Sequence, residues 1–203
     1  NSGEEKAYAA LQESFKRLGT DYIDLVLVHQ PFGDYYGTYR ALERAYTEGT
    51  VRAIGVSNFY QDKFYDLAYH CRIYPMINQL ETNVFSQQTQ MREMLKEYGT
   101  KVMAWGPMAQ GKENFNENEI LKETGCRYGK TGIQTALRFL AQEGIPSIPK
   151  SSKAERMKEN IDIFDFELTA EEMNTLRAMN QTDMGTRDYT SLPYVKRLIS
   201  QKS

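Results

Sequence analysis

The feature that most constrains the fold is a regular alternation of short apolar segments with segments of helical periodicity. Apolar residues recur at helical spacing over 4–18 and Gly19 follows them, which predicts a helix that ends at this glycine. The next segment, 22–29, is an apolar run with the length of a buried strand. Because this pair of patterns is repeated along the chain, we expect parallel strands joined by helical crossovers.

The same patterns place the remaining elements. Strands are expected at 22–29, 51–58, 74–82, 101–105 and 145–150. Helices are expected at 4–18, 38–48, 60–70, 87–98, 117–128 and 131–143, and then from two capping boxes, Ser152 with Glu155 and Thr169 with Glu172, to about 163 and 179. The polar tail over 181–203 is expected to hold one short helix.

The spacing of the strands favours one α/β architecture. The predicted strand ends near His29, Ser57, Gln79, Trp105 and Lys150 are 28, 22, 26 and 45 residues apart, and the longest interval holds two helices. Such near-even units are typical of a (β/α)8 TIM barrel. A doubly wound sheet is less favoured because no glycine-rich dinucleotide fingerprint follows any strand.

A closed barrel of this kind needs eight strands, and five are expected here. We therefore interpret 1–203 as a single domain, the C-terminal part of a barrel of which strands 4 to 8 are present. On this interpretation, about 70 to 90 residues with three strands and two helices belong on the N-terminal side.

Composition excludes several classes of function. With 25 basic and 27 acidic residues, the net charge of −2 excludes a strongly basic nucleic-acid binder. No apolar run has the length of a membrane span, and the N-terminus is not a signal peptide. Cys71 and Cys126 lie far apart without metal-ligand spacing, which indicates reduced thiols in a cytoplasmic protein and no metal site.

The end of the last predicted strand suggests an anion site. Lys150, the hydroxyl groups of Ser151 and Ser152, and the N-terminus of the following helix converge there, and Arg156 lies in the first turns. Free backbone N–H groups, the helix dipole and two cationic side chains favour a phosphate group. A capped helix with solvated Lys150 and Arg156 explains the same residues, and spacing alone does not decide between the two.

Polar side chains also stand at the other strand ends. His29 can act as a general acid or base, or as a hydrogen-bond donor to a carbonyl group, although a buried structural histidine is the alternative. Ser57, Asn58 and Gln79 suit a carboxamide ligand, but they can equally cap strand ends. Trp105 can stack on a flat ring, and packing is the more frequent role of a single tryptophan.

Five motifs resemble the aldo-keto reductases, in the same order and over nearly the whole chain. They are LGTDYIDLVLVHQP at 18–31, GTVRAIGVSNF at 49–59, INQLETN at 77–83, VMAWGPMAQG at 102–111 and IPKSSKAERMKENIDIFDFELTAEEM at 148–173. The chain looks most like members near diketogluconate reductase and prostaglandin F synthase. The resemblance implies a (β/α)8 barrel that binds NADPH across its strand ends without a Rossmann motif.

The resemblance also implies a role for each cofactor-binding residue. Ser57, Asn58 and Gln79 would hold the nicotinamide carboxamide, and Trp105 would stack on the ring, where most members have tyrosine. Met108 and Gln110 would line the pyrophosphate. Lys150, Ser151 and Arg156 would bind the adenosine 2′-phosphate, and Glu159 and Asn160 would contact the adenine, which implies a preference for NADPH.

His29 matches the catalytic histidine of the family, which orients and polarises the substrate carbonyl. The family also uses an Asp, a Tyr and a Lys, which the resemblance places before residue 1, so this chain alone is expected to be inactive. Tyr35 and Tyr36 are expected in the loop after His29, where they would line an aromatic substrate pocket together with Trp105 and Tyr189.

The resemblance implies an NADP-dependent oxidoreductase that reduces aldehyde and ketone carbonyls to alcohols in the cytoplasm. Its partners would be a small carbonyl substrate and NADPH, with no nucleic acid and no membrane. The full-length protein would be a monomer, and a truncated one could self-associate through open sheet edges. The alternative is a catalytically dead barrel fragment that acts as a cofactor-binding or protein-interaction module.

Overall fold

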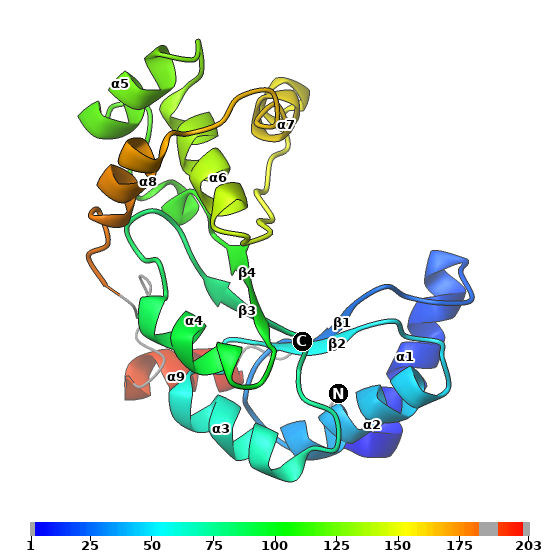
Figure 1. The fold of residues 1–203 in the computed structure, drawn as a ribbon. Helices are drawn as coiled ribbons and strands as arrows, with labels where there is room; N and C mark the ends of the chain where they lie inside the picture. Colours follow the sequence, from blue (N-terminus) through cyan, green and yellow to red (C-terminus); the bar gives the residue numbers. More distant parts are fainter. Residues whose placement is uncertain (1–2, 183–190, 201–203) are drawn as a thin grey trace. The chain divides into compact units, whose positions relative to one another are not determined.

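The computed structural model describes residues 3–182 and 191–200 (Figure 1). The chain forms two compact units, one of Asn1–Gln79 with Met91–Val102 and the other of Leu80–Gln90 with Met103–Ser203. The first is called unit 1 and the second unit 2. Among the described residues, no helix has both the length and the apolar character that crossing a membrane requires. Cytoplasmic location stays a prediction.

Unit 1 alternates helices with parallel strands, as expected. Its elements in order are α1 (Glu4–Leu18), β1 (Val26–Val28), α2 (Tyr35–Thr47), β2 (Ile54–Ser57), α3 (Gln61–His70), the start of β3 (Ile77–Glu81), most of α4 (Thr89–Lys96) and the start of β4 (Lys101–Trp105). The strands follow one another in the order β1-β2-β3-β4. The α/β class with a parallel sheet is therefore confirmed.

The register of the strands in unit 1 places polar residues side by side. Val26 pairs with Ile54 in the β1–β2 ladder, and Ser57 pairs with Gln79 in the β2–β3 ladder. The β2 strand is buried along its whole length, as the middle of a covered parallel sheet requires. Helices α1 and α2 lie against each other (Figure 1).

Glycine at the centre of β2 is required by a close approach of the neighbouring backbone. A Cβ atom on Gly55 would lie 2.3 Å from the carbonyl oxygen of Ile77 and 2.8 Å from Leu27 Cδ2. We expect Gly55→Ala to lower the free energy of unfolding by about 3 kcal/mol, the upper end of the usual cost of overpacking, since backbone cannot move aside as a side chain can. Urea denaturation measures the change.

Gly19 provides the control for this prediction. It ends α1 with a φ of 65°, and a Cβ atom added to it would have no other atom within 4 Å. Gly19→Ala should therefore cost about 1 kcal/mol, the cost of the left-handed conformation alone. Equal effects of the two substitutions would contradict the close-approach argument.

Unit 2 contains the remainder of β3 and β4 and the helices that follow. These are the 3-10 helix η1 (Ala109–Gly111), α5 (Glu119–Cys126), α6 (Gly132–Gln142), α7 (Ala154–Ile161), α8 (Ala170–Arg177) and α9 (Leu192–Ser200). Helix α6 contacts both α5 and α7, and α8 contacts α5 (Figure 1). Fully buried leucines of α5, α6 and α8 form the core, namely Leu121, Leu137, Leu140 and Leu176.

The fifth predicted strand, at 145–150, is reduced to a single parallel bridge between Ala104 and Ser147. Ala104 donates its N–H to the carbonyl of Pro146 and accepts from the N–H of Ile148. Pro146 and Pro149 have no N–H group, so the segment cannot extend the ladder. The prediction of a regular strand here was wrong, although the segment does lie beside β4.

The predicted capping boxes have different outcomes. The Thr169 box is confirmed, with the Glu172 N–H bonded to Thr169 Oγ1 and the Glu172 carboxylate accepting from the Thr169 N–H. The Ser152 box is wrong, because α7 begins one residue later with Lys153 as its N-cap and no side-chain cap. The N–H of Lys153 bonds instead to Ser151 Oγ at 3.1 Å.

Glu172 links α8 to the end of α5. Its side chain is 6% exposed and accepts from Arg127 at 3.0 Å and from the Tyr128 hydroxyl at 2.6 Å. Burial raises the pKa of this carboxyl, but the hydrogen bonds from Tyr128 and Thr169 outweigh it and hold the pKa below its ordinary value. The ionised carboxylate is therefore part of the folded structure.

We expect Glu172→Gln to lower the free energy of unfolding by roughly 1–2 kcal/mol at neutral pH, since charge-assisted hydrogen bonds become neutral ones. Because the pKa of Glu172 is lower in the folded than in the unfolded chain, its ionised carboxylate stabilises the fold at pH values above the unfolded pKa. This stabilisation is lost as the pH falls through the folded pKa. The difference from wild type should therefore vanish in acid. Urea denaturation at neutral pH and in acid tests this, with Glu171→Gln, at an exposed position, as control. A difference that persists in acid would contradict it.

Candidate functional site

A cavity of about 730 Å³ lies in unit 2, where the segment after β4, the segment after the Ala104 bridge and helix α7 come together. Its walls combine cationic, hydroxyl and amide groups with an apolar part made by Phe115, Ile133 and Ile148. The cavity brings together all residues of unit 2 that were predicted to bind a cofactor, namely Trp105, Met108, Gln110, Lys150, Ser151, Arg156, Glu159 and Asn160.

One end of the cavity is suited to an anion. Lys150 and Arg156 are exposed, and neither has a hydrogen-bond or ion-pair partner within 3–182 and 191–200. The N-terminus of α7 adjoins them, and its first N–H groups receive no side-chain cap. Two unpaired cations beside a helix N-terminus attract a group with two negative charges, such as a phosphate monoester.

The turn that follows β4 has an unusual backbone. Ala109 and Gln110 have φ values of 47° and 56°, in the left-handed region that side chains rarely adopt. Such conformations persist where the surrounding structure imposes them, and they are frequent at ligand sites. In this turn they place Met108 and Gln110 on the cavity wall, next to the half-buried Trp105.

Glu159 and Asn160 reach the cavity from the last turns of α7. Both are half-buried. One carboxylate oxygen of Glu159 accepts a hydrogen bond from Thr131 Oγ1 at 2.7 Å, which fixes the orientation of this side chain. The sequence interpretation did not include Thr131, although its spacing to Gln134 is that of a capping box, and the structure forms that box at the start of α6.

In unit 1, the strand ends bring Ser57, Asn58 and Gln79 into direct contact. Ser57 Oγ and the Asn58 N–H both donate to the carbonyl oxygen of Gln79, at 2.9 and 3.0 Å. Asn58 Nδ2 donates to Ser57 Oγ and to the carbonyl oxygen of His29. Asn58 has a φ of 62° and is 3% exposed, so this strained residue is held by a buried network.

His29 follows β1 directly, at the end predicted for it. Its side chain is exposed, while its carbonyl group is bonded to Asn58. In this chain the imidazole is therefore not a buried structural group, and the predicted catalytic role of His29 stays a prediction. An exposed imidazole at a strand end can donate a hydrogen bond to a ligand oxygen.

Comparison with known proteins identifies the family. The sequence profile described as the aldo/keto reductase family matches residues 2–181. The chain belongs to the aldo/keto reductase family. The resemblance inferred from the five motifs is thereby confirmed.

Among curated aldo/keto reductase relatives, the chain is 41% identical over 184 residues to glyoxal reductase of Bacillus subtilis, covering 90% of this chain and 66% of that protein. It is 39% identical over 183 residues to 9,11-endoperoxide prostaglandin H2 reductase of Trypanosoma cruzi, covering 89% and 65%. The chain thus spans about two thirds of the length of these relatives.

Solved aldo-keto reductases share the fold. One is MGS-M4 from a Medee basin deep-sea metagenome library, with a TM-score of 0.87 at 37% identity, covering 94% of this chain and 70% of that one. Another is a Bombyx mori aldo-keto reductase in complex with NADP, with a TM-score of 0.82 at 33% identity, covering 93% and 67%.

The placement of Tyr35 and Tyr36 in a loop was wrong. Both belong to the first turn of α2, which begins after the N-cap Asp34. The two rings stack with centroids 4.5 Å apart, and both hydroxyl groups donate to Asp66 of α3. Hydrogen bonds from Tyr36 and Tyr35 hold the pKa of Asp66 below its ordinary value.

Burial, and then hydrogen bonding to Tyr36 and Asp66, raises the pKa of Tyr35, so its hydroxyl stays protonated at neutral pH. The tyrosine pair therefore links two helices of unit 1. Its predicted role in a substrate pocket stays a prediction, and Tyr189 lies outside the described residues.

Proposed function

We propose that this chain binds NADPH and that the full-length protein is an oxidoreductase that reduces aldehyde and ketone carbonyls to alcohols. In this proposal the chain supplies strands 4 to 8 of a (β/α)8 barrel. Membership of the aldo/keto reductase family supports the reaction class. The Bombyx mori neighbour in complex with NADP supports the cofactor.

The observation that carries the proposal is the unit 2 cavity with Lys150 and Arg156, two cations that have no partner among the described residues. Lys150, Ser151 and Arg156 would hold the adenosine 2′-phosphate, which NADH lacks. The planar guanidinium of Arg156 and the ammonium of Lys150 are the groups that bind phosphate in proteins. The donor set of this cavity therefore fits NADPH, and it favours NADPH over NADH.

The other cavity residues suit the remaining parts of the dinucleotide. Glu159 and Asn160 would contact the adenine through carboxylate and amide groups. Met108 and Gln110 would line the pyrophosphate. Trp105 would lie against the nicotinamide ring, since a flat aromatic surface stacks on another.

In unit 1, Ser57, Asn58 and Gln79 would bind the nicotinamide carboxamide, which both donates and accepts hydrogen bonds. NADPH, when bound, supplies the hydride that reduces the carbonyl carbon. The exposed His29 would donate a hydrogen bond to the carbonyl oxygen of the substrate. This hydrogen bond orients the carbonyl group and stabilises the negative charge that develops on its oxygen.

A turnover assay of the full-length protein tests the proposed reaction. Full-length protein mixed with NADPH and a nitrobenzaldehyde should consume NADPH and form the corresponding alcohol. Failure to consume NADPH with any broad test aldehyde would overturn the proposal. The alternative of an interaction module has no specific observation in its favour, and the curated relatives bear the names of reductases.

A further inference from the structure

Helix α7 carries three of the proposed cofactor contacts, yet it has no buried face of its own. None of its residues is buried, and Met157 and Ile161 are 50% and 70% exposed. Arg156 and Glu159 nevertheless need a fixed position to recognise a ligand. Polar contacts between α7 and the start of α6 are therefore expected to contribute to holding this helix in place.

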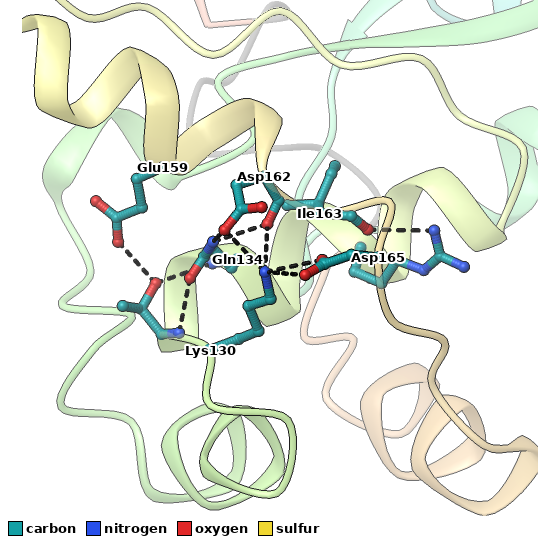
Figure 2. Close-up of polar contacts among 8 residues, drawn as sticks. Lys130, Gln134, Glu159, Asp162, Ile163 and Asp165 are labelled. Carbon is teal, nitrogen blue, oxygen red and sulfur yellow. Dashed lines mark hydrogen bonds and ion pairs between the residues drawn. The ribbon is translucent and has the colours of Figure 1, made fainter.

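Lys130 is at the centre of these contacts (Figure 2). Its ammonium group donates to Asp162 Oδ2 at 2.8 Å, to the Asp162 carbonyl at 3.2 Å and to the Asp165 carboxylate at 2.8 Å. These acceptors match the three donors of a lysine ammonium. The Lys130 side chain is 9% exposed, so the group is largely enclosed by its partners.

Asp162 is the C-cap of α7, which makes the position of Lys130 electrostatically favourable. The C-terminus of a helix carries a partial negative charge, and a cation there is stabilising. Gln134 Nε2 also donates to the carbonyl of Asp162 at 2.8 Å (Figure 2). The C-terminal end of α7 is thus bound by Gln134 of α6 and by Lys130, which directly precedes Thr131, the N-cap of α6.

Two further hydrogen bonds extend this attachment. Thr131, the residue after Lys130, donates from its hydroxyl group to Glu159, which lies three residues before Asp162. Arg138, two turns along α6, donates to the carbonyl of Ile163 at 3.2 Å. Lys130 itself does not line the cavity, so any effect on the cofactor has to be transmitted through α7.

We propose that Lys130 is a positioning residue for the cofactor, which fixes α7 so that Arg156 and Glu159 face the 2′-phosphate end of the dinucleotide. This inference rests on the proposed function of the cavity. Hydrogen bonds to Asp162 and Asp165 raise the pKa of Lys130, and its ammonium lowers that of Asp165. The ion pair therefore persists at neutral pH.

The test compares Lys130→Met with Lys130→Arg by fluorescence titration with NADPH and with NADH. In Lys130→Met, the Kd for NADPH should rise roughly tenfold, as expected when a hydrogen bond to a charged group is lost. The Kd for NADH should rise less, by under about threefold, since NADH shares the adenine contacts of α7 but makes no 2′-phosphate contact with Arg156. Lys130→Arg retains the charge and should restore most of the affinity.

Two further variants separate positioning from a general loss of folding. Asp165→Asn should keep the fold, because Asp165 is an exposed partner of Lys130. Like Lys130→Met, it should raise the Kd for NADPH more than the Kd for NADH. Lys122→Met removes an exposed lysine of α5 and should leave both Kd values unchanged. Hydrogen exchange over 154–161 should become faster in Lys130→Met and stay unchanged in Lys122→Met.

The outcomes distinguish this inference from the proposed function. A wild-type chain that prefers NADPH, with the same preference in Lys130→Met and Asp165→Asn, would overturn the positioning role alone. Equal weakening of NADPH and NADH would also overturn it, because that is the effect of a merely structural residue. A wild-type chain that binds neither dinucleotide would overturn the proposed function and this inference together.

Discussion

Replacing Lys150 and Arg156 together by methionine should raise the Kd for NADPH by at least roughly 100-fold, since each charged hydrogen bond contributes about 1.5–3 kcal/mol. Neither side chain has a partner within the described ranges 3–182 and 191–200, so their removal leaves no buried charge behind. Stability should therefore change little. Affinity for NADH should fall far less than affinity for NADPH, and the preference between the two should disappear.

The control for this pair is Lys158→Met. Lys158 lies on the same helix, is exposed and does not line the cavity. Titration of the three proteins with NADPH and NADH measures the effect. If the double variant kept its preference for NADPH, the phosphate would have to bind elsewhere. If Lys158→Met lost as much affinity, the effect would be one of general charge and not of this site.

Replacing His29 by leucine, which has no hydrogen-bond donor, should lower kcat of the full-length protein by roughly 10²- to 10³-fold, the usual cost of removing one hydrogen-bond donor to a developing oxyanion. The Kd for NADPH should stay near its wild-type value. The imidazole is exposed at the end of β1, and the hydrogen bond from Asn58 is accepted by the backbone carbonyl of His29, not by its side chain. The substitution should therefore leave the fold intact.

His70 is a matched control, because the chain has two histidines and this one is also exposed. Its Nδ1–H donates a hydrogen bond to the backbone carbonyl oxygen of Asp66 on α3. His70→Leu should leave kcat within about twofold of wild type, as surface substitutions usually do. A His29→Leu protein with wild-type kcat would remove His29 from the proposed mechanism.

The positions of the elements were predictable because apolar periodicity and helix-terminal residues act locally. Gly19 ends α1 in a left-handed conformation, as its place after the apolar stripe indicates. The strand lengths were less predictable. An apolar run over 22–29 forms a regular ladder over Val26–Val28 and otherwise an isolated bridge at Ile23, because ladder length depends on the partner strand.

The start of α2 shows a second limit of local rules. The helix was expected to begin at residue 38, whereas α2 begins at Tyr35. The structure forms this earlier first turn because Asp34 caps it and the Tyr35 hydroxyl bonds to Asp66 on another helix. Such tertiary contacts have no signature in a local pattern.

The composition of the cavity could be anticipated, because functional residues in parallel α/β folds collect at strand ends and the motifs name them. The contacts that hold α7 beside the cavity could not be anticipated. Lys130 lies 32 and 35 residues from Asp162 and Asp165, and nothing in the sequence near Lys130 points to them. Contacts at that separation are set by how α6 and α7 pack.

The central claim is that this chain holds an NADPH site with a 2′-phosphate subsite. Equilibrium titration of the chain with NADPH and then NADH, followed by protein fluorescence, tests it most directly. We predict saturable binding of NADPH that is at least about tenfold tighter than that of NADH, equivalent to one charged contact. Absence of saturable NADPH binding, or equal affinity for the two dinucleotides, would contradict the claim.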